Sequence, residues 1–345
     1  MRRSLLFGVL GAVLLLFWVI PPTISLAEEQ WILTNQGYKI LGDFLEINDT
    51  ANWTGDAENG FVAGYGTLQL YRNGNLYFKY EGTMLNGKMN GKGIMIFTDG
   101  SSYEGDIVNG QMSGKGIYTS TDGHRYEGDF LNDQMNGKGI MTLANGTRFE
   151  GNFINNQMNG KGIMTSVRGD RYEGNFVNGQ GSGKGVLTTA KGDHYEGDFL
   201  NSQKNGKGIF ISAKGDRYEG DFLDNQMNGK GFITFANGDR YEGDFINGRM
   251  SGKGVYTASN GDRYKGDFVD DKPSGKGILT YTNGNRYEGD IVNGHITGKG
   301  NFTFANGDHY EGDFLNGKRN GKGINYSHNG TVTEGRWSND TYIGS

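Results

Sequence analysis

The sequence predicts an all-β fold: an elongated, twisted, antiparallel sheet built from tandem 23-residue β-hairpin repeats. An aromatic-Glu-Gly triplet recurs every 23 residues without insertion, with Lys265 replacing the glutamate once. Short runs of aromatic and β-branched residues alternate with Asn-Gly turn signals, and no apolar spacing of three or four persists. The 62 glycines and only 3 prolines exclude collagen and proline-rich disorder.

Eleven aromatic residues begin the repeats and are expected to be their structural aromatics. In such an array each unit contacts mainly its neighbours, and atypical ends act as caps. The eleven residues are Tyr80, Tyr103, Tyr126, Phe149, Tyr172, Tyr195, Tyr218, Tyr241, Tyr264, Tyr287 and Tyr310.

One repeat, residues 218–240, illustrates the expected hairpin. Tyr218 and Phe222 lie on one face of the first strand with Gly220 between them, and Glu219 lies on the other face. Glycine is costly in a strand, so we expect a ring from an adjacent strand to lie against its backbone.

Two glycine motifs of each repeat are assigned to turns. Asn237-Gly238 suits a tight hairpin turn that requires φ > 0. The Gly-Lys-Gly motif is also similar to a phosphate-binding loop. Between Gly87 and Lys92, however, the glycine spacing is one residue short, no Ser or Thr follows, and no helix is predicted. Tight hairpin geometry therefore explains this motif better.

The repeat also sets the expected domain boundaries. A worn repeat precedes the eleven regular units, and a half-repeat follows them. The expected divisions are a signal peptide or membrane anchor at 1–27, an N-terminal cap or worn repeat at 28–52, a degenerate repeat at 53–79, eleven repeats at 80–332 and a C-terminal half-repeat cap at 333–345.

Residues 1–27 have the layout of a secretory signal peptide. Two arginines precede sixteen apolar residues at 5–20, and Ser25 and Ala27 supply small residues at a cleavage site. The apolar run is short of the roughly 20 residues that span a bilayer. A cleaved signal, an uncleaved anchor and a buried core helix all remain open. With either of the first two, the remainder is exported to a secreted, periplasmic or cell-surface location.

Charge and cysteine content exclude several classes of function. The 34 basic and 39 acidic residues are mixed throughout the chain, so no single-sign field exists to attract nucleic acid. The absence of cysteine excludes disulfides, thiol catalysis and cysteine-bound zinc or iron–sulfur sites.

The lysine of Gly-Lys-Gly recurs in every repeat and is the candidate anion-binding or lipid-binding residue. In a hairpin array these lysines form a row with a spacing of about 10 Å, although Glu and Asp rows dilute its potential. The lysine row comprises Lys92, Lys115, Lys138, Lys161, Lys184, Lys207, Lys230, Lys253, Lys276, Lys299 and Lys322.

Catalytic, metal and cofactor sites are not expected. Paired carboxylates such as Glu127 and Asp129 recur in almost every repeat, whereas an active site is normally singular. None of the five histidines has a second ligand at metal-binding spacing. They are His124, His194, His295, His309 and His328. Methionines such as Met112 recur at one turn position, where they form either a soft exposed edge for a partner or packing beneath the adjacent turn.

The consensus Y-E-G-D-F-x-N-G-x-x-x-G-K-G, followed by nine residues ending in N-G-D-R, resembles the MORN (membrane occupation and recognition nexus) repeat. The resemblance is strong over 80–332 and weak over 53–79. Its departures are Phe149, Lys265 and Pro273, the last expected in a turn. The resemblance implies a single elongated β-sheet that serves as a non-catalytic scaffold, a dimerisation surface or a phospholipid-contacting module.

These observations favour a non-catalytic, extracytoplasmic protein that binds protein partners or itself. The alternative is a binder of anionic phospholipid or anionic polymer through the lysine row, which steep salt dependence would distinguish. An extracytoplasmic enzyme is the third class, and it would require one repeat to break the pattern with converging polar groups.

Overall fold

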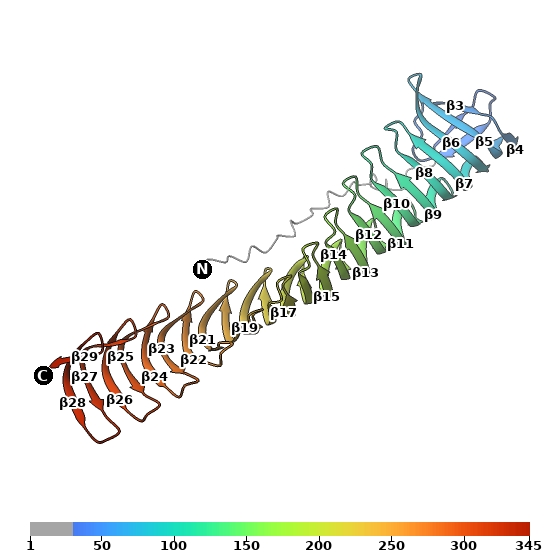
Figure 1. The fold of residues 1–345 in the computed structure, drawn as a ribbon. Coiled ribbons are helices and arrows are strands. Elements are labelled where there is room, and N and C mark those ends of the chain that lie inside the picture. The colour runs from blue at the N-terminus through green and yellow to red at the C-terminus, as the bar shows by residue number, and fades with distance from the viewer. Residues whose placement is uncertain (1–29) are drawn as a thin grey trace. The chain divides into compact units, whose positions relative to one another are not determined.

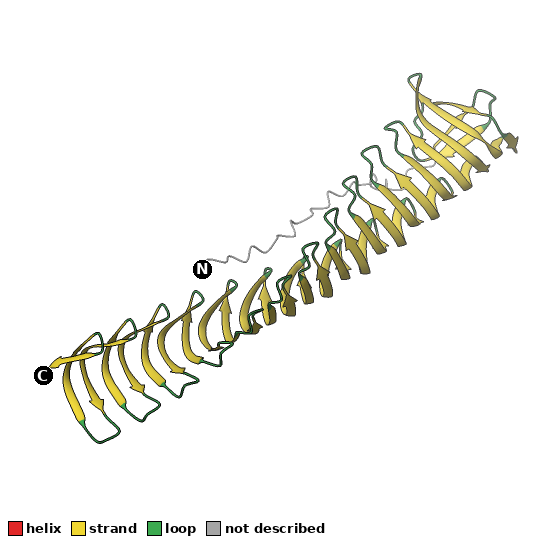
Figure 2. Cartoon of the chain, in the orientation of Figure 1, coloured by secondary structure: helices red, strands yellow, loops and turns green. Residues whose placement is uncertain are grey.

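The computed structural model describes residues 30–345, and their regular structure is entirely β-strand (Figures 1 and 2). The all-β prediction of tandem antiparallel hairpins is confirmed. The described chain divides into two units, residues 30–190 and 191–345. The expected signal or anchor at 1–27 lies outside the described residues. Within 30–345 there is no helix of the length and apolarity that a membrane span requires.

The first unit contains fifteen strands, five of which precede the regular repeats. They are β1 (Gln30–Leu33), β2 (Lys39–Gly42), β3 (Thr50–Trp53), β4 (Asp56–Glu58), β5 (Phe61–Arg72), β6 (Asn75–Leu85), β7 (Lys88–Phe97), β8 (Ser102–Val108), β9 (Gln111–Thr119), β10 (Arg125–Leu131), β11 (Gln134–Thr142), β12 (Arg148–Ile154), β13 (Gln157–Thr165), β14 (Arg171–Val177) and β15 (Gln180–Thr188).

The second unit contains fourteen strands, and the last two lie beyond the regular repeats. They are β16 (His194–Leu200), β17 (Gln203–Ile211), β18 (Arg217–Leu223), β19 (Gln226–Thr234), β20 (Arg240–Ile246), β21 (Arg249–Thr257), β22 (Arg263–Val269), β23 (Lys272–Thr280), β24 (Arg286–Val292), β25 (His295–Thr303), β26 (His309–Leu315), β27 (Lys318–Tyr326), β28 (Val332–Ser338) and β29 (Thr341–Gly344).

Each repeat forms one antiparallel hairpin, and neighbouring hairpins pair edge to edge. β10 and β11 form such a hairpin, and β11 also pairs antiparallel with β12 of the next repeat. Seven residues of β10, a two-residue turn, nine residues of β11 and a five-residue loop make up the period of 23. Backbone hydrogen bonding thus continues across repeat boundaries within the unit, which an isolated hairpin could not achieve.

The two strands of each hairpin are joined by a two-residue turn that the sequence did not reveal. Asp224 and Asn225, which link β18 to β19, have φ of 47° and 69°. Two consecutive left-handed residues characterise a type I′ turn, and Asp and Asn tolerate this conformation. Asn237-Gly238 instead belongs to the five-residue loop after β19, in which Gly238 alone takes positive φ, at 91°. The expected turn with positive φ at Asn237-Gly238 is present, closed by the N–H of Gly238, which donates to the carbonyl oxygen of Phe235 at 2.9 Å, and it joins β19 to β20.

One face of each unit's sheet, called the inner face, buries the aromatic residue that begins each repeat. All eleven are at most 5% exposed. The Tyr126 ring meets Phe130 of its own strand edge-to-face, with ring centroids 5.1 Å apart, and meets Phe153 of the next repeat at the same distance. Its hydroxyl donates to the carbonyl oxygen of Asp129 at 3.1 Å. These contacts, repeated along each unit, join successive hairpins through their side chains.

Two glycines of each repeat allow the tyrosine ring to lie against the backbone. A Cβ at Gly128 would stand 2.6 Å from Oη of Tyr126 and 2.5 Å from Cα of Gly139. The sequence predicted that a ring from an adjacent strand lies against the glycine between the two aromatic residues. The ring over Gly128 comes instead from the same strand as the glycine, and it also covers Gly139 of the adjacent strand. Substitution of either glycine would push the ring off the sheet.

The Gly-Lys-Gly motif lies within a strand, and its assignment to a tight hairpin is wrong. In β11, Gly137 takes φ of 109° at a β-bulge, where the register with β10 shifts between Gly128 and Phe130. Gly139 lies beneath the tyrosine ring. The motif therefore combines a bulge with a close ring contact, and its lysine projects from the middle of a strand.

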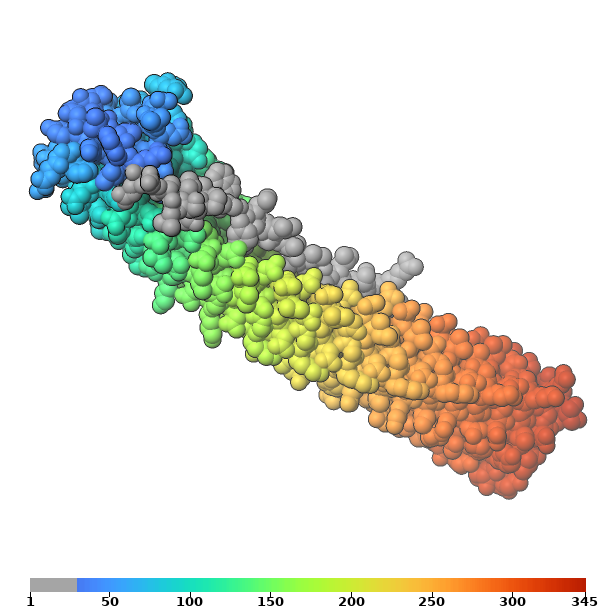
Figure 3. Space-filling model, turned by 180° about the vertical axis from the view of Figure 1, so that it is seen from behind, coloured from blue at the N-terminus to red at the C-terminus, as the bar shows by residue number. Residues whose placement is uncertain are grey.

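The ends of the described chain depart from the repeat. In the first unit β3 pairs antiparallel with β5, and β2 meets β5 in parallel at a single residue pair. Figure 3 shows these N-terminal residues, in blue, as a bulky end of the first unit. At the other end of the chain, the ring of Trp337 in β28 packs edge-to-face on Tyr310, with centroids 5.4 Å apart. Trp337 thus takes the position of the next repeat's phenylalanine.

Candidate binding site on the outer face

The opposite face of each sheet, called the outer face, presents three rows of side chains. In β10, Glu127, Asp129 and Leu131 alternate with the buried Tyr126 and Phe130. The same alternation recurs in each repeat, because side chains along a strand point to opposite faces in turn. The outer face therefore carries a glutamate row, an aspartate–lysine row and an apolar row.

The apolar row places one half-exposed aliphatic residue at the end of the first strand of each hairpin. Their exposed fractions lie between 49% and 59%. The sequence analysis did not identify these residues. They could have been predicted, because each follows the outward-facing residues, mostly glutamate and aspartate, at every second position of the same strand. The row consists of Leu85, Val108, Leu131, Ile154 and Val177 in the first unit, and Leu200, Leu223, Ile246, Val269, Val292 and Leu315 in the second.

Most residues of the lysine row face an aspartate of the next repeat. Lys115 of β9 stands opposite Asp129 of β10, and its Nζ lies 2.5 Å from Oδ1. Such exposed pairs contribute little stability, but they cancel much of the charge of the row. The seven pairs are Lys92–Asp106, Lys115–Asp129, Lys207–Asp221, Lys230–Asp244, Lys253–Asp267, Lys276–Asp290 and Lys299–Asp313.

At two of these ion pairs the lysine lowers the pKa of the aspartate. The hydrogen bond from Lys92 is the main cause that lowers the pKa of Asp106, and the backbone N–H of Lys115 adds to it. The side chain of Lys276 lowers the pKa of Asp290 in the same way. Anions that approach these lysines must therefore compete with a carboxylate that is already bound.

Two lysines of the first unit lack this aspartate. Lys138 stands opposite Asn152, and Lys161 stands opposite Asn175. Neither lysine forms an ion pair within residues 30–345. An asparagine offers no charge to neutralise an ammonium group. Lys138 therefore shares a single carboxylate, that of Asp129, with Lys115, and Lys161 faces an asparagine at the cross-strand position.

The glutamates nearest to Lys138 and Lys161 do not supply the missing negative charge, because arginines on the same strands already neutralise them. Arg148 lies 2.7 Å from Glu150 in β12, and Arg171 lies 2.7 Å from the carboxylate of Glu173 in β14. Arg125 pairs with Glu127 in the same way at 2.8 Å. The positive charge at the two asparagine-containing repeats therefore remains.

The outer face of the first unit is hollowed into a groove of about 910 Å³. Its lining includes Ile94, Ile117 and Ile140, which stand between successive glutamates, and the lysines Lys138 and Lys161. The paired glycines beneath the tyrosine rings also contribute to the lining, since they carry no side chain on either face. The groove thus combines apolar surface with the two lysines that stand opposite asparagines.

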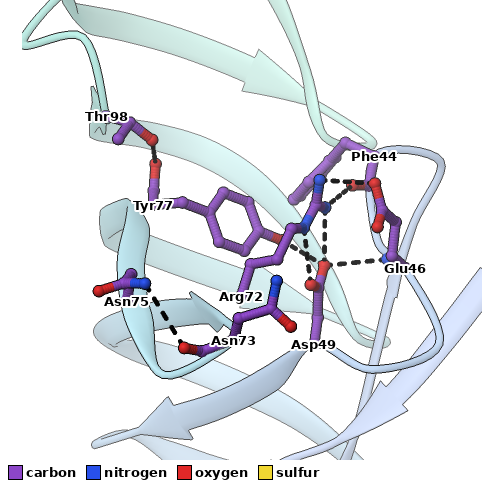
Figure 4. Close-up of polar contacts among 8 residues, drawn as sticks. All are labelled: Phe44, Glu46, Asp49, Arg72, Asn73, Asn75, Tyr77 and Thr98. Atoms are coloured by element: carbon purple, nitrogen blue, oxygen red, sulfur yellow. Dashed lines mark hydrogen bonds and ion pairs between the residues drawn. The ribbon is translucent and has the colours of Figure 1, made fainter.

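A polar cluster that is not repeated lies at the N-terminal end of the first unit, around the carboxylate of Asp49 (Figure 4). Arg72 binds the carboxylate of Asp49 through two nitrogens at 2.9 and 3.0 Å, and the Tyr77 hydroxyl donates to it at 2.7 Å. The backbone N–H of Glu46 adds a fourth hydrogen bond at 2.9 Å. These contacts, chiefly that with Arg72, lower the pKa of Asp49 to about 2. Both carboxylate oxygens are hydrogen-bonded and the side chain is fully buried, which indicates a structural clamp.

The histidines and paired carboxylates form no convergent site. Nε2 of His124 lies 3.1 Å from Oδ2 of Asp122, and its Nδ1 accepts the backbone N–H of Ala144 at 3.1 Å. His328 pairs with Asp308 at 2.9 Å. No group of three or more potential metal ligands occurs in residues 30–345.

The recurrent methionines and Pro273 lie in strands and not in turns. They occupy the second position of the second strand of their hairpins, opposite a buried apolar residue of the first strand: Met112 faces Ile107, and Pro273 faces Phe268. Met112 is 5% exposed, so the packed alternative holds and the exposed methionine edge is wrong. At this position one repeat carries Lys204, which is 7% exposed and has its Nζ 4.9 Å from the Phe210 ring centroid.

Comparison with known proteins identifies the family. The family model of the MORN repeat matches eleven consecutive segments of 23 residues, from 80–102 to 310–332. The chain belongs to the MORN repeat family. Members of this family are repeat proteins that serve in binding or scaffolding.

No curated protein matches the chain. Among solved structures, the TCP domain of Drosophila melanogaster SAS-4 in complex with a proline-rich motif of Ana2 is 15% identical, with a TM-score of 0.30 over 51% of this chain and 90% of that one. The TCP10 domain of Danio rerio CPAP is 10% identical, with a TM-score of 0.22 over 71% and 99%. Virginiamycin B lyase from Staphylococcus aureus is 12% identical, with a TM-score of 0.14 over 75% and 89%.

Proposed function

We propose that this MORN repeat protein is a non-catalytic, extracytoplasmic scaffold that binds a protein partner on the outer face of its hairpins. The apolar row carries the proposal. Half-exposed Leu, Val and Ile side chains recur in every repeat, where a polar residue would be equally compatible with the strand. Regularly spaced apolar side chains beside charged rows are typical of a protein interface, in which apolar contacts are flanked by polar ones.

The lipid alternative receives less support from the charges. Recognition of an anionic membrane surface usually requires a cluster of about four to eight basic residues. Seven lysines of the lysine row are neutralised by aspartates, and nearby arginines are neutralised by glutamates. A protein interface needs no such net charge, so the same surface suits a protein partner better.

The enzyme alternative lacks a singular reactive group. Within residues 30–345, the cluster around Asp49 departs from the repeat, but its carboxylate is buried beneath Arg72, Tyr77 and Glu46 and offers no oxygen to solvent. A general base needs a free lone pair directed at a substrate. The cluster therefore supports a structural function for this end of the array.

Site-specific photo-cross-linking in the native cell tests the proposed interface. A photoreactive residue at Leu131 or Leu223 should yield a discrete protein adduct. The matched positions Asn145 and Asn237 are exposed loop residues and should not. The molar mass of the purified chain, measured by light scattering, shows whether the partner is a second copy of the chain or a different protein. Equal adducts at all four positions, or adducts at none, would refute the proposal.

Export is tested separately with an epitope tag at the C-terminus. The apolar stretch at residues 5–20 motivates this part of the proposal. Protease added to intact cells should remove a cell-surface tag, and osmotic release should expose a periplasmic one. A tag that stays protected until the cytoplasmic membrane is disrupted would place the array inside the cell.

A further inference from the structure

We infer that the groove of the first unit contains an anion-binding subsite, made by Lys138 and Lys161, that receives two carboxylates of an acidic peptide segment. The inference rests on the proposed scaffold function and names the chemistry of its partner. Both lysines line the groove and are exposed. They are distinguished from the other lysines of the row by what stands opposite them.

The local charge is the first argument. The residue that follows the aromatic-Glu-Gly triplet is an aspartate in eight repeats and an asparagine in two, Asn152 and Asn175. The aspartates are Asp106, Asp129, Asp198, Asp221, Asp244, Asp267, Asp290 and Asp313. The backbone geometry is unchanged, since Lys138 still pairs in register with Asn152 and Lys161 with Asn175. Two consecutive lysines thus lack the cross-strand aspartate that the other paired lysines have, and Lys138 shares Asp129 with Lys115. An external carboxylate can take the place that the aspartate holds elsewhere.

The spacing is the second argument. Lys138 lies on β11 and Lys161 on β13, two strands further along the sheet. Two inter-strand steps of about 4.8 Å place the two positions about 10 Å apart. Carboxylates seven residues apart on an α-helix stand about 10.5 Å apart on one face, and residues three apart in a polyproline II segment stand about 9.3 Å apart on one face. A peptide can therefore present one carboxylate to each lysine.

The surface beside the lysines is the third argument. Ile117 and Ile140 stand on either side of Glu127 and belong to the same groove lining. Aliphatic side chains of a peptide can pack there while its carboxylates reach the lysines. A flat lipid surface would meet two lysines without a cross-strand aspartate, fewer than a membrane-binding cluster contains, and its head groups would leave the apolar lining unfilled. The observations thus favour an acidic peptide.

The test uses the full-length protein and fluorescein-labelled oligo-glutamate, with oligo-glutamine of the same length as the uncharged probe. Fluorescence anisotropy should show binding of oligo-glutamate only. The variant Asn152→Asp/Asn175→Asp restores the residue present in eight other repeats, so it should fold normally. It supplies an internal counterion to each lysine and should weaken binding about tenfold, because two exposed pairs together contribute on the order of 1.4 kcal/mol.

A matched control adds the same charge elsewhere. Asn237→Asp/Asn306→Asp changes two exposed loop asparagines of the second unit and should leave binding unchanged. A gain of function provides a further check, since Asp129→Asn removes the carboxylate bound by Lys115. This variant should bind oligo-glutamate more tightly, by about threefold, because it removes the carboxylate that acts on both Lys115 and Lys138.

Three results would overturn the inference. They are absence of oligo-glutamate binding, equal binding by the wild type and Asn152→Asp/Asn175→Asp, and equal weakening by the loop control. Vesicles of phosphatidylglycerol in phosphatidylcholine test the lipid source. If the restored aspartates abolish vesicle binding but leave oligo-glutamate binding intact, the subsite belongs to a lipid and the inference fails. Cross-links at Leu131 without oligo-glutamate binding would leave the scaffold function standing and remove only this subsite.

Discussion

Replacing Lys204 with methionine should stabilise the protein, an unusual outcome for a substitution in a buried position. Lys204 occupies the position that other repeats fill with Met227 or Met250, and it is 7% exposed. Burial lowers the pKa of its ammonium group to about 8. The folded state therefore disfavours the charged form that water stabilises in the unfolded chain.

The magnitude follows from the pKa. A fall from 10.5 to about 8 corresponds to about 3 kcal/mol at neutral pH, since one unit is worth 1.36 kcal/mol. The ammonium lies 4.9 Å from the ring centroid of Phe210 and 5.4 Å from that of Tyr195, and these cation–π contacts return about 1 kcal/mol. Lys204→Met should thus raise the free energy of unfolding by about 2 kcal/mol at pH 7.

The pH dependence provides the specific signature. Between pH 8 and 10.5 the unfolded chain binds more protons at Lys204 than the folded chain does, so the stability of the wild type rises with pH. Below pH 8 the cost of the buried charge is fully present. The advantage of the methionine variant should therefore be greatest at pH 7 and shrink by about 1.4 kcal/mol per unit above pH 8.

Urea denaturation followed by circular dichroism at pH 7 and pH 9.5 measures both effects. Lys207→Met is the matched control, because that lysine is 71% exposed and pairs with Asp221. Its effect should stay within about 0.5 kcal/mol at both values of pH. A Lys204→Met variant that is less stable than the wild type, or whose gain is the same at both values, would show that Lys204 is not a buried charge.

Three further changes test the fold. Asp49→Asn should destabilise the protein by about 2 kcal/mol at pH 7, because the folded state lowers the pKa of Asp49 to about 2. Thermal unfolding should show that this deficit disappears as the pH falls from 4 to 2 and the carboxylate becomes protonated. Gly139→Ala should cost about 1–3 kcal/mol in urea denaturation by displacing the Tyr126 ring, whereas Thr142→Ala should cost under about 0.5 kcal/mol. Deleting residues 241–263 should leave the β signal per residue unchanged, and deleting about half of them should reduce it; equal losses would refute the modular account.

The candidate site could be predicted only in part. The strict period identified the lysine row, and strand alternation placed the glutamates and aspartates on the face away from the tyrosines. The significance of Asn152 was not evident, because its partner Lys138 is fourteen residues away and belongs to the preceding repeat. The inter-repeat register decides which charges meet, and no pattern within one repeat contains that register.

The lengths of the two connections in each repeat could not be predicted for a related reason. Asn237-Gly238 is the dipeptide most typical of a two-residue hairpin, but the chain uses it in a five-residue loop. Asp224-Asn225 forms the tight turn without any glycine. Local preference permits both dipeptides to adopt left-handed conformations, and the pairing of the flanking strands selects between the two connections.

The sequence by itself determined the all-β class, the 23-residue hairpin, the MORN family and the aromatic identity of each repeat's buried face, because these depend on periodicity that is visible along the chain. Only the tertiary structure decided that Gly-Lys-Gly lies within a strand, that the apolar row is exposed and that Lys138 and Lys161 lack a cross-strand aspartate. Those features depend on which strands pair and in what register, and pairing brings together residues whose separation along the chain gives no sign of their contact.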